Sequence, residues 1–305
     1  MNYNSLAVGS QNFLKKNHNR LYEGGLRLKK IFKQSSKNRP LITIITVVLN
    51  NEKFIEETIN SIINQKYTNI EYIIIDGGSS DNTLNIIKKY QDNIDYIISE
   101  SDNGLYDAMN KGLILSRGDL IGIVNSDDVL TKSAMDYLVQ YYFKHPKLDL
   151  FFGTVRKHWG LLHGFKPFKI KYSWFFYTSH STGFYITRRA AIINGKYSLD
   201  YKTSSDFDYF YRAIVHNKFK GIASKKNELF GIFRPGGASN QVDFWELFFE
   251  KIQIRIDNKQ NKYLIFLTLI LKLIKSLKRI RTLNKKVLIN FLKKNYGSRD
   301  NLDQI

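Results

Sequence analysis

The 305-residue chain contains no cysteine. This absence excludes disulfide bonds and metal sites built on thiolates, and it fits a reducing cytoplasm. The first twenty residues lack the apolar run of a signal peptide. The most apolar stretch near the C-terminus, residues 263–274, is shorter than the roughly 20 residues that a membrane-spanning helix needs. We therefore expect a cytoplasmic protein.

Acidic residues are scarce at both ends of the chain, and the formal net charge is +20. Residues 1–39 hold 9 Lys and Arg against 1 Asp and Glu, residues 40–240 hold 24 against 20, and residues 241–305 hold 14 against 6. Basic flanks suit anionic lipid, nucleic acid or a solvated lysine-rich surface. The sequence shows no zinc-binding spacing, RNP-like segment or glycine-rich phosphate loop, so we expect no nucleic-acid partner.

Apolar β-branched runs alternate with segments of helical spacing from residue 41 onward. Such runs are typical of strands buried on both faces of a parallel sheet. The alternation predicts an α/β fold with a doubly wound, mostly parallel sheet and flanking helices. The expected strands are residues 41–49, 70–76, 94–99 and 118–125, and the expected helices are residues 52–65, 83–91 and 105–116.

Polar side chains follow the ends of four predicted strands. They are Asn50, Asp76, Asp102 and Asp127. In open sheets of this kind the ligand sits outside the carboxyl ends of the strands. We therefore expect these four side chains to converge on one crevice.

The remaining segments suggest three parts of the chain. Residues 1–39 form a basic extension with weak helical patterning. Residues 40–240 form the main domain, in which the aromatic-rich part after residue 128 is expected to extend the sheet with mixed structure. Residues 241–305 form a basic helical region.

The strand pattern ending in IVNSDD carries the strongest chemical signal. Asp127 and Asp128 follow a buried strand, with Asn125 beside them. Hard oxygen ligands of this kind suit Mg²⁺ or Mn²⁺, which bind one or two carboxylates together with substrate phosphates. By itself the pair has an equally good alternative, which is to cap the helix that begins near Thr131.

The motifs ITVVLNN, IIIDGGSSDNT, SDNGLYDAMNKG and IVNSDD occur in this order at strand–turn spacing. Together they resemble the inverting family 2 glycosyltransferases, which have the GT-A fold. The resemblance covers residues 41 to about 240. It implies a metal-dependent enzyme that takes a sugar from a nucleotide-diphosphate sugar and passes it to an acceptor hydroxyl.

The resemblance also implies a donor site. The first strand and the Asp that ends the second strand hold the base and ribose in the family. The metal-binding motif of the family corresponds to residues 125–127, where Asp127 is the implied metal ligand and Asn125 stands in place of an Asp. Met109 stands where many relatives have a donor-contacting Arg, which leaves Asp107 and Lys111 as weak substitutes. The implied donor residues are Val47, Leu49, Asn50, Asp76, Asn125 and Ser126.

An inverting transfer needs one general base that takes the proton of the attacking hydroxyl. The family position of this base corresponds to Asp206 in SSDFDYFYR, with helix capping as the alternative. Asp208 is the fallback, expected to cap the helix or face solvent. His180 corresponds to a family position near the acceptor, although a lone His is more often structural. The Gly236–Gly237 turn suits either a loop that closes over the acceptor or an ordinary surface turn.

The C-terminal region has a composition that suits a membrane contact. Residues 262–294 contain ten Lys and Arg and no Asp or Glu. A basic helix with an apolar face fits an anchor on an anionic membrane surface, and a helix packed on the main domain is the alternative. We expect a peripheral protein at the inner face of the cell membrane that acts on a glycan or lipid-linked acceptor in bacterial surface polysaccharide synthesis. The competing hypotheses are an inactive glycan-binding protein of the same fold and a nucleic-acid-binding protein.

Overall fold

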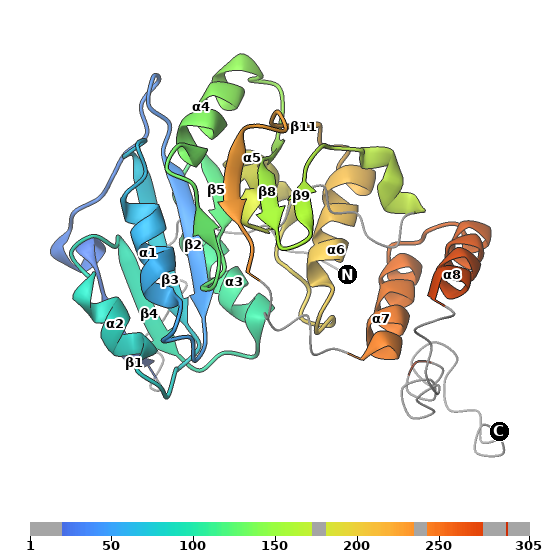
Figure 1. Ribbon diagram of the computed structural model, residues 1–305, viewed down its shortest axis with the longest axis horizontal. Coiled ribbons are helices and arrows are strands. Elements are labelled where there is room, and N and C mark those ends of the chain that lie inside the picture. The colour runs from blue at the N-terminus through green and yellow to red at the C-terminus, as the bar shows by residue number, and fades with distance from the viewer. Residues whose placement is uncertain (1–19, 173–180, 235–242, 277–290, 292–305) are drawn as a thin grey trace.

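A computed structural model describes residues 20–172, 181–234, 243–276 and 291. An eight-stranded sheet in the order β1-β4-β3-β2-β5-β10-β7-β11 forms the middle of the molecule (Figure 1). Its strands are β1 (Arg20–Gly24), β2 (Ile42–Val48), β3 (Ile70–Asp76), β4 (Tyr96–Glu100), β5 (Leu120–Ile123), β7 (Leu150–Phe152), β10 (Phe184–Thr187) and β11 (Gly221–Ala223).

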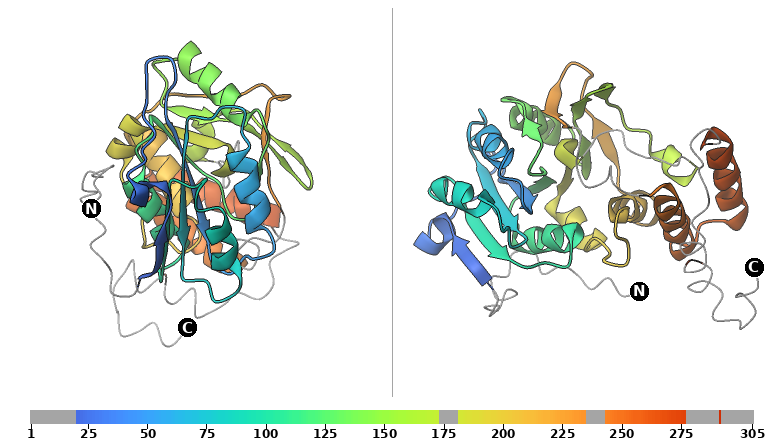
Figure 2. Two further views of the ribbon diagram at one scale, coloured as in Figure 1. Left: turned by 90° about the vertical axis from the view of Figure 1, so that its left-hand side faces the viewer. Right: turned by 60° about the horizontal axis from the view of Figure 1, so that its bottom comes forward.

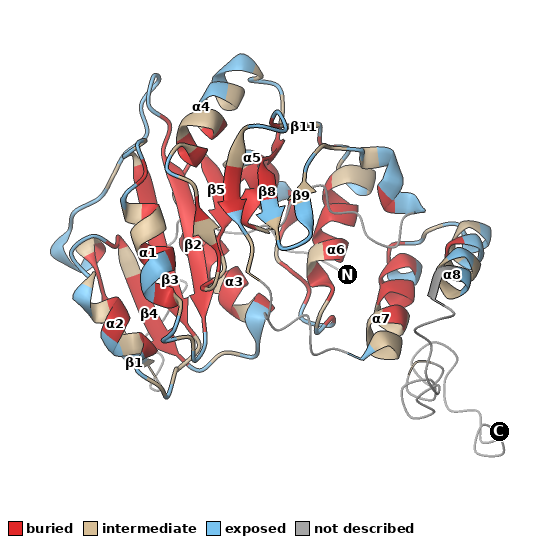
Figure 3. Cartoon of the chain, viewed as in Figure 1, coloured by how far each residue is buried: buried red, intermediate tan, exposed pale blue. Residues whose placement is uncertain are grey.

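The centre of the sheet is parallel, as the apolar runs predict. β2 pairs in parallel with β3 and β5, and β3 pairs in parallel with β4. Every residue of β2 and β3 is buried (Figure 3). Strands covered on both faces need no alternation of apolar and polar residues, which explains their continuous Ile and Val content. The doubly wound α/β fold is confirmed.

Helices cover both faces of the sheet. Alternate residues of β2 point to opposite sides, so Ile45 and Val47 belong to one core and Ile42 and Ile44 to the other. The first core contains residues of α3, α5 and α6, and the second contains residues of α1, α2 and α4. These helices are α1 (Ile55–Ile63), α2 (Thr83–Lys89), α3 (Leu105–Leu115), α4 (Ala134–Lys144), α5 (Arg188–Asn194) and α6 (Ser205–Tyr211).

Part of the segment expected to be a basic extension belongs to the sheet. Residues 20–24 form β1, which pairs antiparallel with β4. A short 3-10 helix follows, and its Arg27 forms an ion pair of 2.7 Å with Glu71 of β3, both side chains being 3% exposed. The weak helical patterning of this segment did not predict a strand. The division into three domains stays a prediction.

A second, four-stranded sheet begins directly after the NSDD turn. It has the order β6-β12-β8-β9 and lies beside the larger sheet (Figure 1). β12 pairs antiparallel with β6 and in parallel with β8. Its strands are β6 (Val129–Leu130), β8 (Thr154–Lys157), β9 (Gly160–Leu162) and β12 (Leu229–Ile232).

The C-terminal part of the chain is helical where it is described. α7 (Phe244–Asp257) and α8 (Lys262–Ser276) lie at the end of the molecule farthest from β1 (Figure 2). Phe248 and Ile252 of α7 pack against one side of α8. Of the helices that the structure describes, none is both long and apolar enough to cross a membrane.

Candidate active site

The loops that follow β2 and β3 are joined by hydrogen bonds. The Asn50 amide N–H donates to Ser79 Oγ at 2.8 Å, and the Ser80 amide donates to Asn50 Oδ1 at 2.8 Å. Asn50 has a φ of 50°, a left-handed conformation that Asn tolerates better than most residues. In the next turn the Asn51 amide donates to Thr83 Oγ1 at 2.8 Å. The two loops therefore form one wall at the carboxyl edge of the sheet.

Asp76, the last residue of β3, lies beneath this wall and is fully buried. Its carboxylate accepts hydrogen bonds of 2.5 Å from Ser79 Oγ and from Ser99 Oγ of the neighbouring β4. A buried carboxylate needs such donors, because an unpaired charge in the interior is costly. Asp76 thus fixes the turn after β3, and a nucleotide that hydrogen-bonds to it would compete with one of these hydroxyls.

The end of β4 adds a second carboxylate to the same place. A Cβ atom at residue 77 would lie 2.5 Å from Asp102 Oδ2, so only glycine leaves room for this side chain. The Gly104 amide donates to Asp102 Oδ1 at 2.8 Å. Burial raises the pKa of Asp102 above its usual range, against the effect of this hydrogen bond. Asp102 therefore lies against the turn after β3, which makes it a further candidate for donor contact.

The NSDD turn joins the loop after β2 to the second sheet. Asn51 Nδ2 donates to Ser126 Oγ at 2.8 Å, and Asn125 Nδ2 donates to Ser181 Oγ at 3.1 Å. Asp127 is partly exposed. Asp128 is fully buried and accepts a hydrogen bond from Thr182 Oγ1. The two carboxylates therefore differ in their surroundings, and Asp128 serves to hold the turn.

The NSDD turn offers too few oxygen ligands to hold a metal ion alone, so a substrate would have to supply further ligands. Within the described part of the chain, no three His, Asp or Glu residues gather closely enough to hold a metal ion. Besides the Asp127 carboxylate, the buried Asn125 Oδ1 lacks a hydrogen-bond partner among the described residues. Mg²⁺ commonly binds through one or two protein ligands plus substrate phosphates and water. The residues of the turn fit that kind of site.

The one lysine of α3 is engaged within the fold, so α3 does not offer a cation to the diphosphate of the expected donor. Met109 is buried in the core and faces away from the crevice. Lys111 forms an ion pair of 3.0 Å with Glu100 and donates to the Ser101 carbonyl oxygen at 3.2 Å. Asp107 accepts from the Asn103 amide at 3.0 Å, so both weak substitutes are used within the fold.

Asp206 lies at the start of α6, near Tyr106 in the first turn of α3. Burial and the charge of Asp206 together raise the pKa of Tyr106 well above its usual value, and the same two causes contribute for Tyr197. The two tyrosine rings stack with their centroids 5.7 Å apart. Asp206 itself is partly exposed. Its carboxylate therefore stands near the loop after β4, at the border of an aromatic cluster.

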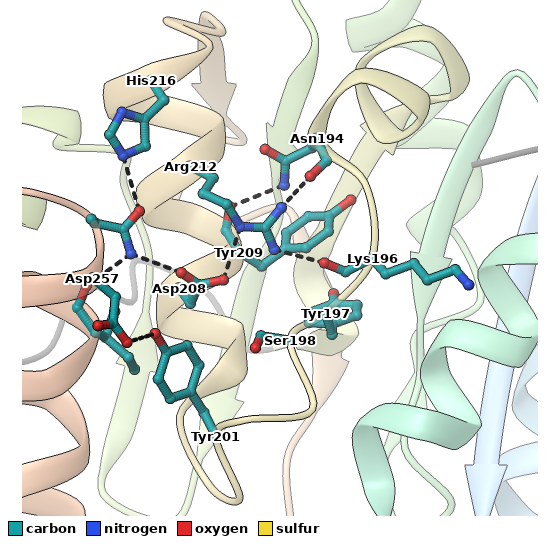
Figure 4. Close-up of polar contacts among 12 residues, drawn as sticks. Asn194, Lys196, Tyr197, Ser198, Tyr201, Asp208, Tyr209, Arg212, His216 and Asp257 are labelled. Atoms are coloured by element: carbon teal, nitrogen blue, oxygen red, sulfur yellow. Dashed lines mark hydrogen bonds and ion pairs between the residues drawn. The ribbon is translucent and has the colours of Figure 1, made fainter. Parts of the chain in front are cut away.

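Asp208, two residues further on, has a different environment (Figure 4). The expectation that it caps the helix or faces solvent is wrong, because its side chain is fully buried. Arg212 Nε donates to Asp208 Oδ2 at 2.8 Å, and Asn258 Nδ2 of α7 donates to Asp208 Oδ1 at 2.8 Å. Arg212 Nη2 also donates to the Lys196 carbonyl oxygen at 2.7 Å. Asp208 ties α6 to its neighbours and has no access to a substrate.

Two expected elements lie outside the described residues. His180, the predicted acceptor residue, is one of them, and the Gly236–Gly237 turn is the other.

The family model for Glycosyl transferase family 2 matches residues 43–196, which is half of the chain. The chain belongs to this family. An uncharacterized glycosyltransferase of Methanocaldococcus jannaschii is 26% identical over 255 residues, covering 71% of this chain and 88% of the relative. A PGL/p-HBAD biosynthesis glycosyltransferase of Mycobacterium bovis is 27% identical over 217 residues, covering 67% of this chain and 80% of the relative.

Solved structures of GT-A glycosyltransferases share the fold of this family 2 member. TarS of S. aureus in complex with UDP-GlcNAc superimposes with a TM-score of 0.63 at 16% identity, covering 83% of this chain and 80% of TarS. The mannosyltransferase PcManGT of Pyrobaculum calidifontis, in complex with GDP-Man and Mn²⁺, gives a TM-score of 0.56 at 14% identity, covering 90% and 86%. The GT-A fold and the membership of a glycosyltransferase family are confirmed.

Replacing Asp208 with Asn is expected to lower the free energy of unfolding by about 3–5 kcal/mol, because Arg212 then becomes a buried charge without a carboxylate. Urea denaturation followed by circular dichroism measures this change. Asp200→Asn, in the exposed loop before α6, is the matched control and should cost less than about 1 kcal/mol. Equal stability of Asp208→Asn and the wild type would contradict the buried ion pair.

Proposed function

We propose that the protein is an inverting glycosyltransferase that moves a sugar from a nucleotide-diphosphate sugar to a hydroxyl of a glycan or lipid-linked acceptor, in bacterial surface polysaccharide synthesis. The observation that carries the proposal is the joining of the four strand-end loops by hydrogen bonds that run from Asn51 to Ser126 and from Asp76 to Ser99. Two structural neighbours whose structures contain nucleotide sugars support a nucleotide-sugar donor for this protein.

The proposed donor site uses the residues of this edge. Val47 is buried, so it contributes backbone and shape, whereas Leu49 is 57% exposed beside Asn50. Asp76 is buried at the end of β3 and fixes the turn that follows it. Asn125 and Ser126 belong to the NSDD turn, and their amide and hydroxyl groups suit the hydroxyls of a ribose or sugar.

Asp127 and the Asn125 amide oxygen would hold Mg²⁺ or Mn²⁺ together with the donor diphosphate. Such an ion, when bound, offsets the negative charge that builds up on the leaving nucleotide. The comparison with PcManGT, whose complex contains Mn²⁺, supports this choice of metal.

Asp206 is the proposed general base. As the acceptor oxygen forms its bond to the anomeric carbon, the bond from that carbon to the diphosphate oxygen breaks, and the hydroxyl proton passes to the Asp206 carboxylate. Attack from the face opposite the leaving group inverts the anomeric configuration. The position of Asp206 at the start of α6, next to Tyr106 of α3, supports this role.

α8 is the proposed contact with an anionic membrane surface. One of its faces packs on α7, and its other face exposes large apolar side chains. Tyr263 is 73% exposed, Phe266 63% and Ile274 59%. The spacing of these residues places them on one side of the helix, away from the Ile265, Leu269 and Leu273 face that packs on α7. The two alternatives for this region, packing and membrane contact, therefore apply to different faces of one helix.

Asp127→Asn should reduce turnover on the order of a thousandfold, because it removes the charged ligand for the metal. The assay is metal-dependent hydrolysis of UDP-GlcNAc, GDP-mannose and a panel of further nucleotide sugars. Asp92→Asn is the matched control, since this carboxylate lies on the surface in an exposed ion pair with Lys29. Near-normal turnover of Asp127→Asn with Mg²⁺ or Mn²⁺ would refute the assignment. Wild-type protein that binds these donors without turning them over would favour the inactive, glycan-binding alternative.

Asp206→Asn should lower turnover roughly a hundredfold or more while the affinity for donor survives. Calorimetric titration with donor and the hydrolysis assay separate these two effects. A loss of donor affinity with unchanged turnover of bound donor would assign Asp206 to binding. NMR spectroscopy of the product should show an inverted anomeric centre, and retention would rule out the proposed mechanism.

Replacing Tyr263, Phe266 and Ile274 with Ser should release the protein from anionic vesicles while its melting temperature stays close to that of the wild type. These side chains make the exposed face, and apolar burial in lipid does not weaken with salt. Co-sedimentation at two salt concentrations should show wild-type binding that falls with salt but persists, since each nearby Lys or Arg adds about 1 kcal/mol of screened attraction. Trp159→Ser, which removes an exposed aromatic ring from β8–β9, is the control. Wild-type protein that ignores vesicles would exclude the membrane contact.

A further inference from the structure

A lysine is buried at the junction of α6 and α7. Lys251 of α7 is only 3% exposed. Lys is almost never fully buried unless its charge is compensated. Its ammonium group lies 5.5 Å from the centroid of the Phe207 ring on α6, the residue that follows Asp206. The two helices lie side by side in both Figure 1 and Figure 2.

The charges of groups on three helices act on this ammonium group. They are Asp206 of α6, Glu250 and Arg255 of α7, and Lys272 of α8, and Asp206 acts on Lys251 most strongly among them. Burial is the largest influence overall and lowers the pKa of Lys251 to about 8, against the opposite effect of Asp206.

The other neighbours already have partners elsewhere. Glu250 accepts hydrogen bonds from the Thr203 amide at 3.1 and 3.2 Å. The Arg255 guanidinium donates to the Lys171 carbonyl oxygen at 2.8 Å and to Gln260 Oε1 at 2.7 Å. Asp206 therefore remains as the principal counter-charge of Lys251.

We propose that Lys251 is a positioning residue for the general base, whose buried ammonium group keeps the Asp206 carboxylate ionised and directed toward the acceptor. The inference rests on the proposed function of Asp206. A carboxylate bordered by Tyr106 and Tyr197 has lost part of its hydration, which favours the protonated acid. A protonated Asp206 cannot accept the hydroxyl proton, so the cation supplied by α7 maintains the form that the reaction needs.

The pairing of Lys251 with Asp206 predicts how turnover depends on pH. Below about pH 8, Lys251 is charged and the ionised carboxylate is favoured. As the pH rises through the pKa of Lys251, the ammonium group loses its proton and no longer directs the Asp206 carboxylate toward the acceptor. Turnover should therefore decline above about pH 8, in addition to its decline at acid pH, where Asp206 takes up a proton.

The pairing can be tested without any substrate. In protein labelled with ¹³C at lysine Cε, the signal missing from Lys251→Met identifies Lys251, and its chemical shift is followed against pH. Loss of a neighbouring carboxylate makes the charged lysine less favourable, so Asp206→Asn should lower the pKa of Lys251 by about one unit or more. Glu250→Gln, the control on the same helix, should lower it by less. An unchanged titration in Asp206→Asn would overturn the pairing.

The pH profile of turnover tests the consequence for catalysis, using hydrolysis of UDP-GlcNAc or GDP-mannose. In Lys251→Met the acid limb should move to higher pH by about one unit or more, and the alkaline decline should vanish. Lys251→Arg, which stays charged, should keep the acid limb and move the alkaline decline to higher pH. Lys272→Met controls for the loss of a nearby cation and should keep both limbs.

These outcomes separate the two proposals. A Lys251→Met profile with both limbs in place and only a lower plateau would leave Lys251 with a structural role and overturn the inference. Full turnover of Asp206→Asn would instead remove the proposed base, whatever the NMR titration shows.

Discussion

The arrangement of the site depends on the parallel pairing of β2, β3, β4 and β5. Parallel neighbours place all their carboxyl ends at one edge, so the turns after them meet without long excursions of the chain. The register aligns Val48 with Asp76 and Asp76 with Ser99. Because both faces of these strands are buried, a slip of the register would move apolar side chains off their core and is strongly disfavoured.

The proposed general base, Asp206, and its fallback, Asp208, lie on the same helix in different environments. Asp206 and Asp208 are two residues apart, which separates them by roughly 200° around α6. Asp206 is partly exposed, whereas Asp208 is enclosed by Arg212 and Asn258. One carboxylate thus fixes the helix in the core, and the other, the proposed base, remains accessible.

The sequence predicted the central sheet well, because continuous runs of Ile and Val have few other uses in a protein of this size. It also predicted which side chains follow the strand ends, and Asn50, Asp76 and Asp102 lie there as expected. The strand at residues 20–24 was missed, since RLYEG is short, contains one Arg and one Glu, and is only partly buried.

The surroundings of buried charges could not be predicted from local pattern. The partner of Asp208 on α7 is 50 residues further along the chain, and Lys251 lies 45 residues after Asp206. The spacing of residues along the chain does not reveal such pairs, because they form only when the helices pack together. For the same reason the helix that contains Asp208 gave no sign that one of its two acids is enclosed.

β1 is an edge strand of the sheet and lies outside the residues that the family model matches. The match begins at residue 43, whereas β1 covers the outer side of β4 through antiparallel hydrogen bonds. A fragment trimmed to the family boundaries would leave the outer N–H and C=O groups of β4 unpaired. An open strand of this kind is a template for another chain, so such a fragment would tend to associate edge to edge and precipitate. Residues 20–24 therefore take the edge position of the sheet, and β4 becomes an interior strand.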